Sequence, residues 1–246
     1  MKNIVIVPVV VDRLLTRRAV NSALGQDIGD VEVWIVGNGA VDGLVEYLRG
    51  VYWSDARVKI SAYPAMRSLN WLWNAWITLA FALGHEHVLV INNDIFMRTD
   101  TYRLLVDDGG LFVTGVSVDT VDGVASADPT SKSPHPCFSC FLIRRECWEL
   151  TGKFDDKFWA YASDADYHLR MEAAGVNAYA LAVPFFHETS ATIRKVDNDT
   201  RDRLQALADA DREMFKVKWG FAVGSDEYYS KFKSARENKY AKEGVL

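Results

Sequence analysis

The chain has 246 residues, 49% of them hydrophobic and 25% charged, with a formal net charge of −5 at pH 7. This length is sufficient for one large α/β domain with a sizeable core. The negative charge excludes a general electrostatic attraction to nucleic acid or to anionic lipid. A basic stretch from Lys216 to Lys242 is the local exception. Such a stretch is typical of a solvated helix face, and the alternative is contact with an anionic acceptor.

Cysteine usage and apolar segments indicate the compartment. The three cysteines cannot form an even disulfide framework, which favours a reducing compartment. Cys137 and Cys140 have the spacing of a zinc pair beside His135, but apolar neighbours favour a buried strand, and no second ligand pair follows. The N-terminus lacks the apolar region of a signal peptide, and the most apolar run, Leu69–Leu83, is too short to span a bilayer. We therefore predict a cytoplasmic protein without a transmembrane segment.

The first part of the chain alternates short strands and helices. Ile4–Val9 is a continuous apolar run, which is typical of a strand covered on both faces in a parallel sheet. Asp12 is positioned to cap a helix that extends to about Leu24. The pattern predicts further strands at Val31–Val36, Val58–Ala62 and His87–Ile91, a short helix ending near Gly50 and a Trp-rich helix over residues 68–83. This alternation predicts a doubly wound α/β sheet, whose ligand crevice lies at the carboxyl ends of the strands.

The second part of the chain is less regular. A Ser/Thr/Asp/Pro-rich excursion, Asp119–Pro136, is predicted to be a long surface loop and a candidate lid. The pattern predicts strands at Leu111–Val116, Phe138–Ile143 and Asn177–Val183, and helices from Asp164 to Gly175, at about Asp199–Phe215 and at Asp226–Ala235. No internal repeat or linker divides the chain into independent domains.

The stretch from Gly152 to Arg170 carries the strongest functional signal. An aromatic-rich loop leads into a helix whose first turn contains Asp164 and Asp166. Carboxylates at a helix start are favoured by the free N–H groups and the helix dipole, so capping is the alternative. Capping does not require an aromatic loop in front of it. Flat apolar faces beside a carboxylate suit a base that acts on a sugar, because partial desolvation raises the basicity of the carboxylate.

Other candidate residues give modest signals one by one. Asp94 follows a buried strand in the sequence Asn92-Asn93-Asp94, where it could cap a helix or bind Mg²⁺ or Mn²⁺. His187 follows a late strand as a partly buried histidine or a second metal ligand. The turn at residues 37–43, which includes Asn38 and Asp42, has the composition of any tight turn. Arg67 could pair with a phosphate, stack on a base or simply be solvated.

The order of these segments resembles that of the family 2 inverting glycosyltransferases of the GT-A fold. The resemblance covers roughly Ile4 to His187. In the first half of the chain it rests on the first strand, on Val36-Gly37-Asn38-Gly39-Ala40-Val41-Asp42-Gly43 as the nucleotide-binding turn, and on Asn74-Ala75-Trp76-Ile77 with Ala80. Asn92-Asn93-Asp94 stands at the place of the metal motif. In the second half it rests on the Gly152–Arg170 stretch, on His187, and on a Lys-Trp-Gly element at Lys218-Trp219-Gly220. The Gly152–Arg170 stretch is the most specific of these matches.

The resemblance implies a role for each candidate residue. Asp164 would be the general base that deprotonates the acceptor hydroxyl, and Asp94 with His187 would hold Mn²⁺ or Mg²⁺ on the donor diphosphate. Trp159, Tyr161 and Asp166 would lie on the acceptor side. The donor is a nucleotide-sugar, with a UDP-sugar favoured, and the acceptor is a glycan, a protein, a lipid carrier or modified nucleic acid. The implied donor-binding residues are Pro8, Val9, Asn38, Asp42, Arg67, Asn74, Asn92 and Asn93.

Four positions depart from the family pattern. Gly37 stands where the family commonly has an aspartate that contacts the nucleobase, and Asn92 stands at the first aspartate of the metal motif. Ser163 replaces a glutamate that often precedes the base, and Trp76 replaces a glycine. These departures bear on nucleobase recognition and leave one carboxylate in the metal motif.

The predicted organisation is a GT-A domain over residues 1–195, divided into a nucleotide-sugar half at 1–96 and an acceptor or catalytic half at 97–195. A helical extension follows at 196–246. Two alternatives to a glycosyltransferase remain: a catalytically silent nucleotide-sugar or glycan binding protein, and a nucleotidyltransferase. The second is disfavoured because no glycine-rich phosphate loop follows the first strand. The glycosyltransferase prediction requires Asp94 and Asp164 to face one crevice.

Overall fold

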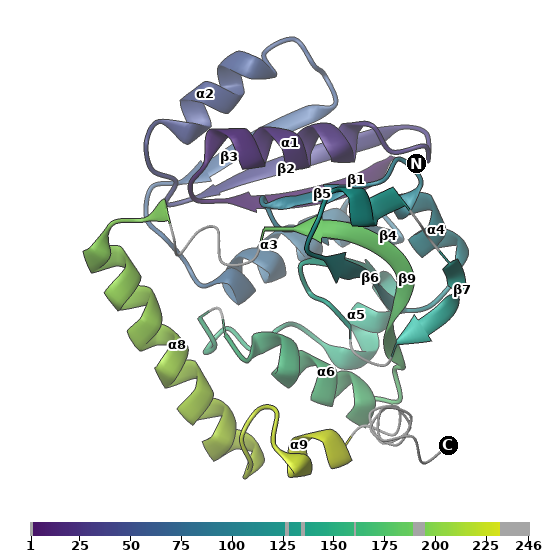
Figure 1. Ribbon diagram of the computed structural model, residues 1–246, viewed down its shortest axis with the longest axis vertical. Helices are drawn as coiled ribbons and strands as arrows, with labels where there is room; N and C mark the ends of the chain where they lie inside the picture. Colours follow the sequence, from purple (N-terminus) through teal and green to yellow (C-terminus); the bar gives the residue numbers. More distant parts are fainter. Residues whose placement is uncertain (1, 126–127, 134–135, 160, 189–194, 232–246) are drawn as a thin grey trace.

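The computed structural model describes residues 2–125, 128–133, 136–159, 161–188 and 195–231. In this part of the chain nine strands form one sheet, in the order β3-β2-β1-β4-β8-β6-β9-β5, with β7 paired to β9 (Figure 1). The strands are β1 (Asn3–Val9), β2 (Val31–Asn38), β3 (Val58–Tyr63), β4 (His87–Ile91), β5 (Ile95–Met97), β6 (Phe112–Val118), β7 (Asp128–Ser133), β8 (Cys140–Arg144) and β9 (Ala178–His187). The predicted α/β class is confirmed.

The first four strands form a parallel unit. β1 pairs in parallel with β2 and with β4, and β2 pairs in parallel with β3. Residues Ile4 to Val7 are 0% exposed, as the continuous apolar run predicts for a strand covered on both faces. The predicted cap is also confirmed, because the Asp12 carboxylate accepts hydrogen bonds from the backbone N–H groups of Leu14 and Leu15, both at 2.9 Å. The helix that it begins, α1 (Arg13–Leu24), ends at the predicted residue.

Helices cover both faces of the sheet (Figure 1). The face that carries Val5 and Val7 packs against α1, α2 (Leu44–Val51) and α4 (Thr101–Asp107). The opposite face, which carries Ile4 and Ile6, packs against α3 (Leu69–Ala82), α5 (Arg145–Thr151) and α6 (Ser163–Ala173). Alternate residues of one strand therefore enter two different cores. Trp73 of α3 is 3% exposed, so it fills the second core rather than binding a ligand.

The excursion at Asp119–Pro136 is not a free lid. It contains a 3₁₀ turn, η1 (Asp122–Ala125), and strand β7, which pairs antiparallel with β9. Its Ser, Thr and Pro content favours a loop, but an edge strand tolerates these residues because one side makes no ladder hydrogen bonds. Residues 126–127 and 134–135, including His135, lie outside the described residues. The sequence pattern also missed α4, α5 and the short strand β5.

The C-terminal helices belong to the same packed body. α8 (Asn198–Trp219) runs along one side of the protein and leads to α9 (Asp226–Ser230) near α6 (Figure 1). Phe215 and Phe221 form a third apolar cluster with Phe158, Ala162, Ala165 and Leu169. The predicted last helix is described as far as Ser230. Because α8 packs on the loop and helix that carry Asp164, it is placed to influence the candidate site.

Candidate active site

The carboxyl ends of β1, β2 and β4 meet at one edge of the sheet, as the parallel topology requires. Pro8 and Val9 end β1 there, with Val9 opposite Gly37 of β2. The Val9 side chain is 0% exposed and belongs to the core, so only its backbone is available to a ligand. The Pro8 side chain is partly exposed.

Asn38 holds the segment that precedes α3. Its amide donates to the carbonyl of Arg67 at 3.0 Å and accepts from the N–H of Arg67 at 2.8 Å. The Arg67 guanidinium is exposed and lies 5.4 Å from the ring centroid of Trp71. Asn38 is therefore occupied in positioning Arg67, and Arg67 is the residue that can reach a ligand. Asp42 is exposed at a φ of 56°, and its carbonyl accepts a hydrogen bond from Arg13.

Asn74 has a different environment from the predicted one. Its amide nitrogen donates to the carbonyl of Phe154 at 2.8 Å, and its amide oxygen accepts from the Phe154 N–H at 2.9 Å. Both polar atoms of the side chain are thereby used to join α3 to the loop before α6. The contacts support an anchoring role for Asn74 in place of donor binding.

The two asparagines after β4 tie neighbouring segments together. Asn93 is 8% exposed and donates to the carbonyl of Val11 and to the hydroxyl of Thr16, both at 2.9 Å. These bonds fix the loop between β1 and α1. The Asn92 amide lies 3.3 Å from the hydroxyl of Ser139 and is partly exposed. Asn92 is therefore the more accessible of the two to a ligand.

Asp94 and His187 form a carboxylate–imidazole pair. Asp94 Oδ1 lies 3.4 Å from His187 Nε2 and has no hydrogen-bond partner among the described residues, although Asp94 is only 6% exposed. A buried carboxylate oxygen without a partner requires an explanation, and a divalent cation supplies one. Oxygen and imidazole nitrogen are ligands that suit Mn²⁺. Among the described residues no group of three or more His, Cys, Asp or Glu side chains gathers as a metal site, so the protein itself offers two ligands.

The loop from Lys153 to Ala162, which we call the aromatic loop, is held from two sides. From α3, Leu69 donates its N–H to the Trp159 carbonyl at 2.7 Å, and Asn70 donates to the Asp155 carbonyl at 2.8 Å. From α8, the carboxylate of Asp211 accepts the N–H groups of Trp159 and Tyr161. The Trp159 and Tyr161 side chains are both partly exposed. They can therefore line an acceptor site, as predicted.

Asp164 is open to solvent in the first turn of α6, yet surrounding protein desolvates it. This burial raises the pKa of its carboxyl group, although the hydrogen bond from the Ala165 N–H at 2.9 Å acts in the opposite direction. Its negative charge in turn raises the pKa of Cys137 and of Tyr228, whose own burial is the larger cause in both cases. Asp164 thus faces the segment before β8 on one side and α9 on the other.

Asp166, predicted for the acceptor side, is buried and paired with cationic and aromatic side chains. It is 1% exposed, and its carboxylate accepts hydrogen bonds from Arg170 Nε at 3.0 Å and from Trp219 Nε1 at 2.9 Å. Lys218 Nζ lies 2.7 Å from the same carboxylate. These contacts support an anchoring role for Asp166, which joins the end of α8 to α6, in place of the predicted acceptor-side role.

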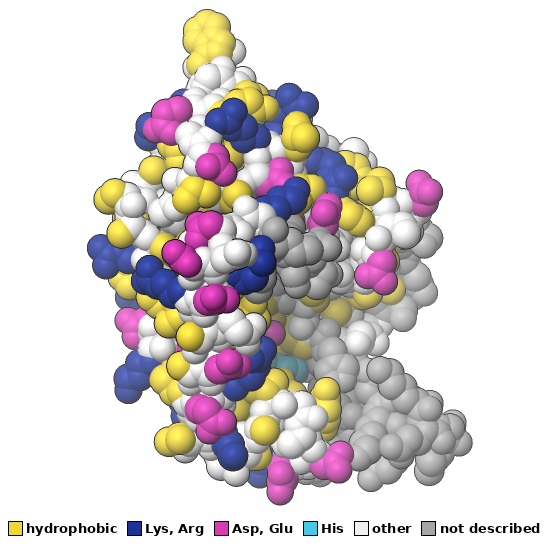
Figure 2. All heavy atoms as spheres, turned by 60° about the vertical axis from the view of Figure 1, so that its left-hand side comes forward, with side chains coloured by type: hydrophobic (Ala, Val, Ile, Leu, Met, Phe, Trp, Pro, Cys, Tyr) yellow, Lys and Arg dark blue, Asp and Glu magenta, His cyan; other side chains and the backbone are white. Residues whose placement is uncertain are grey.

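The segment from Cys137 to Ser139 links the two candidate carboxylates. Ser139 contacts Asn92, two residues before Asp94, and Cys137 lies within electrostatic reach of Asp164. Figure 2 shows that the face on which α8 lies is hollowed and carries Lys or Arg and Asp or Glu side chains intermixed around the hollow. A histidine side chain is visible inside it.

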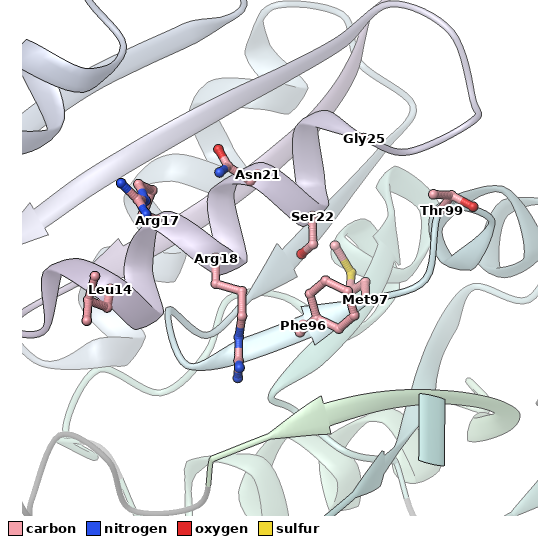
Figure 3. Close-up of a pocket in the computed structure, with 9 residues that line it drawn as sticks. All are labelled: Leu14, Arg17, Arg18, Asn21, Ser22, Gly25, Phe96, Met97 and Thr99. Atoms are coloured by element: carbon pink, nitrogen blue, oxygen red, sulfur yellow. The ribbon is translucent and has the colours of Figure 1, made fainter. Parts of the chain in front are cut away.

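A separate pocket of about 530 Å³ lies between α1 and β5 (Figure 3). Arg18 extends from α1 across it and lies 4.6 Å from the ring centroid of Phe186 and 5.9 Å from that of Phe96. No residue that the sequence analysis singled out lines this pocket, so it is distinct from the predicted site. Its lining residues are Leu14, Arg17, Arg18, Asn21, Ser22, Gly25, Phe96, Met97 and Thr99.

Comparison with solved structures identifies the fold. The first 349 residues of TarS from S. aureus superpose with a TM-score of 0.56 at 16% identity, covering 94% of this chain and 77% of that one. The mannosyltransferase PcManGT from Pyrobaculum calidifontis, solved with GDP-Man and Mn²⁺, gives a TM-score of 0.56 at 15% identity over 100% of this chain and 81% of that one. The chain has the GT-A fold of glycosyltransferases.

Sequence comparison points in the same direction. The chain is 24% identical over 212 residues to chondroitin synthase from Pasteurella multocida, a match that includes 76% of this chain and 21% of that protein. It therefore spans about a fifth of the length of that relative. No protein-family model matches the chain. None of the helices in the described part of the GT-A fold combines the length and apolarity that crossing a bilayer requires.

Local packing in this chain explains the glycine at position 37. A Cβ atom there would lie 2.7 Å from Val45 Cγ2 and 3.2 Å from Ala62 Cβ, so α2 and β3 fill the space that a side chain needs. An aspartate cannot stand there without displacing both neighbours. The exposed side chain of Arg67, whose backbone is held by Asn38 at the end of the same strand, remains available to a ligand.

Proposed function

We propose that this protein transfers a sugar from a nucleoside diphosphate donor to an acceptor hydroxyl, with inversion at the anomeric carbon and with the help of a divalent cation. The observation that carries the proposal is the environment of Asp164. It is open to solvent, its pKa is raised by desolvation, and partly exposed aromatic side chains precede it. These are the properties of a base that meets a sugar hydroxyl.

In the proposed reaction, Asp164 removes the proton from the acceptor hydroxyl as its oxygen attacks the anomeric carbon. The bond between that carbon and the phosphate oxygen breaks from the opposite face, and the electron pair leaves with the nucleoside diphosphate. Attack opposite the leaving group inverts the configuration. A cation held by Asp94 and His187 would stabilise the negative charge on the departing diphosphate.

The donor is proposed to be a UDP-sugar. TarS has been solved with UDP and with UDP-GlcNAc, whereas PcManGT was solved with GDP-Man, so related folds accept either nucleotide. The exposed guanidinium of Arg67 supports contact with a base or a phosphate. Three unpaired cysteines support the reducing, cytoplasmic compartment in which such donors are used.

The test compares the wild-type protein with Asp164→Asn and Asp94→Asn. Donor binding is measured by thermal shift with UDP-, GDP-, dTDP- and CMP-sugars, with and without Mn²⁺, because a bound donor raises the melting temperature by mass action. Turnover is measured as release of the nucleoside diphosphate. We expect Asp164→Asn to bind donor normally and to lose turnover, and Asp94→Asn to lose the Mn²⁺-dependent part of binding.

The alternative, a catalytically silent nucleotide-sugar binding protein, gives a different result. In that case the wild-type protein would show a donor-dependent thermal shift but no nucleotide release with any sugar or acceptor. Unchanged turnover in Asp164→Asn would refute the assignment of the base while leaving transferase activity established.

A further inference from the structure

The carboxylate of Asp211 on α8 is buried against the aromatic loop. Asp211 is 3% exposed. Its two oxygens lie 2.9 and 3.0 Å from the backbone nitrogen of Trp159, and one of them lies 2.9 Å from the backbone nitrogen of Tyr161. A carboxylate can accept hydrogen bonds at both oxygens, and bonds to a charged acceptor are stronger than bonds between neutral groups.

The aromatic loop has few regular backbone partners of its own. It precedes Ala162, which adopts a left-handed φ of 55° immediately before α6 begins. A non-glycine residue in this conformation is held there by its surroundings. From α8, packing of Phe158 with Phe215 and the bonds from Asp211 both constrain the loop, in addition to the bonds from α3 described above.

We propose that Asp211 is a positioning residue for catalysis: it fixes the backbone of the aromatic loop and thereby the placement and enclosure of Asp164. The inference rests on the proposed function, because it assigns α8 to the same site. Asp211 itself touches neither the base nor any reacting atom in this scheme. Its effect passes through the backbone of Trp159 and Tyr161 to the start of α6.

A positioning role for Asp211 predicts a change in the pKa of Asp164, which a role in stabilising the fold alone does not predict. The raised pKa of Asp164 depends on desolvation, so a loosened loop that admits water should lower that pKa toward the usual range. Among the described residues, Cys137 from the segment before β8 and Tyr228 from α9 are the titratable groups shown to be within electrostatic reach of Asp164, and burial raises the pKa of each. Both are therefore neutral at pH 7 and leave desolvation as the main influence on Asp164.

The matched variants are Asp211→Asn and Asp209→Asn. Asparagine has the shape of aspartate but removes the charge of the acceptor, and it places an N–H donor against the backbone N–H of Trp159 that the lost oxygen now accepts from. Asp209 lies on the same helix, and its side chain is 63% exposed and pairs with Arg212 at 2.7 Å. Phe215→Leu is a second probe of the same mechanism and not a control, since it weakens packing of the same loop and keeps the carboxylate bonds.

For Asp211→Asn we expect unchanged affinity for UDP with Mn²⁺, a kcat lower by about ten- to a hundredfold, and an acid limb of the pH–rate profile moved to lower pH. Asp209→Asn should keep the wild-type acid limb, whereas Phe215→Leu should move it in the same direction as Asp211→Asn. In the wild-type protein, the amide hydrogens of Trp159 and Tyr161 should be protected from exchange, which tests the contact even if Asp211→Asn does not fold.

The inference is overturned if Asp211→Asn keeps wild-type turnover and pH dependence, if the two amides exchange at unprotected rates, or if turnover and UDP affinity fall together with the acid limb unmoved. Absence of turnover in the wild-type protein with every donor is a separate outcome that refutes the proposed function first, and this inference with it.

Discussion

Replacing Asp166 by asparagine separates a structural role from an acceptor-binding role. Asp166 is 1% exposed, and its partners Arg170 and Lys218 have side chains that are 22% and 32% exposed. The substitution keeps the shape of the side chain and removes the charge that both cations pair with. It also leaves Trp219 Nε1 and Arg170 Nε competing for a single amide oxygen.

The size of the effect follows from this partial burial. Breaking a fully buried ion pair costs about 3–5 kcal/mol, whereas a surface pair contributes about 0–1 kcal/mol. Because both cations keep contact with water, we expect an intermediate loss of about 2 kcal/mol in the free energy of unfolding. For a chain of this length that corresponds to a fall of about 4–8 °C in Tm.

Urea and thermal unfolding measure this loss, with Asp209→Asn as the control. Asp209 and Arg212 have side chains that are 63% and 52% exposed, so that substitution should change stability by less than about 0.5 kcal/mol. A normally stable Asp166→Asn protein with a raised KM for acceptor would refute the anchoring role and restore the acceptor-side prediction.

Three further predictions concern the base, the donor turn and the cation. Asp164→Asn should raise Tm above that of the wild-type protein at pH 7 and leave it unchanged near pH 3. The reason is that a carboxyl group whose pKa is raised by folding destabilises the folded state only where it is ionised. Equal Tm values for the variant and the wild-type protein at pH 7 as well as at pH 3 would contradict this. Gly39→Ala should lower the free energy of unfolding by about 2 kcal/mol and weaken donor binding, because φ of Gly39 is +61° and a Cβ there would lie 2.5 Å from the Met66 nitrogen. Urea unfolding measures the first effect and titration with UDP the second. Removal of divalent ions with EDTA should lower nucleotide release by the wild-type protein, and Asp94→Asn should make the remaining rate insensitive to added Mn²⁺.

Local signals in the sequence were sufficient for the parallel half of the fold. The buried run at Ile4–Val9, the Asp12 cap and the strand His87–Ile91 depend on neighbouring residues alone, and all three were predicted within two residues of their bounds. Strand β7 was missed because its pairing with β9 comes from tertiary contact and not from its own composition.

The roles of Asp164 and Asp166 could not be separated from sequence. Both lie in the first turn of α6, and residues two apart on a helix point in different directions. One of them had to face the crevice and the other the interior, but the helix pattern alone does not say which. The partners that decide the matter, Lys218 and Trp219, lie more than 50 residues later in the chain. Asp211 gave no signal at all, because its bonds go to backbone groups that every residue has.

The two carboxylates of α6 need opposite environments, and α8 contributes to both. Lys218 pairs with the charge of Asp166, and Trp219 donates a hydrogen bond to its carboxylate. These two contacts fix α6 against the end of α8. Asp211 and Phe215 hold the aromatic loop, so that Asp164 is enclosed but still reached by solvent. A base must be accessible to its substrate and yet poorly hydrated, and these demands conflict on a short surface loop with no support. A long helix packed behind the loop resolves the conflict, because it excludes water from one side and leaves the other open. Helices α8 and α9 thus pack against the loop and helix that carry Asp164, and they form one packed unit with the rest of the described chain.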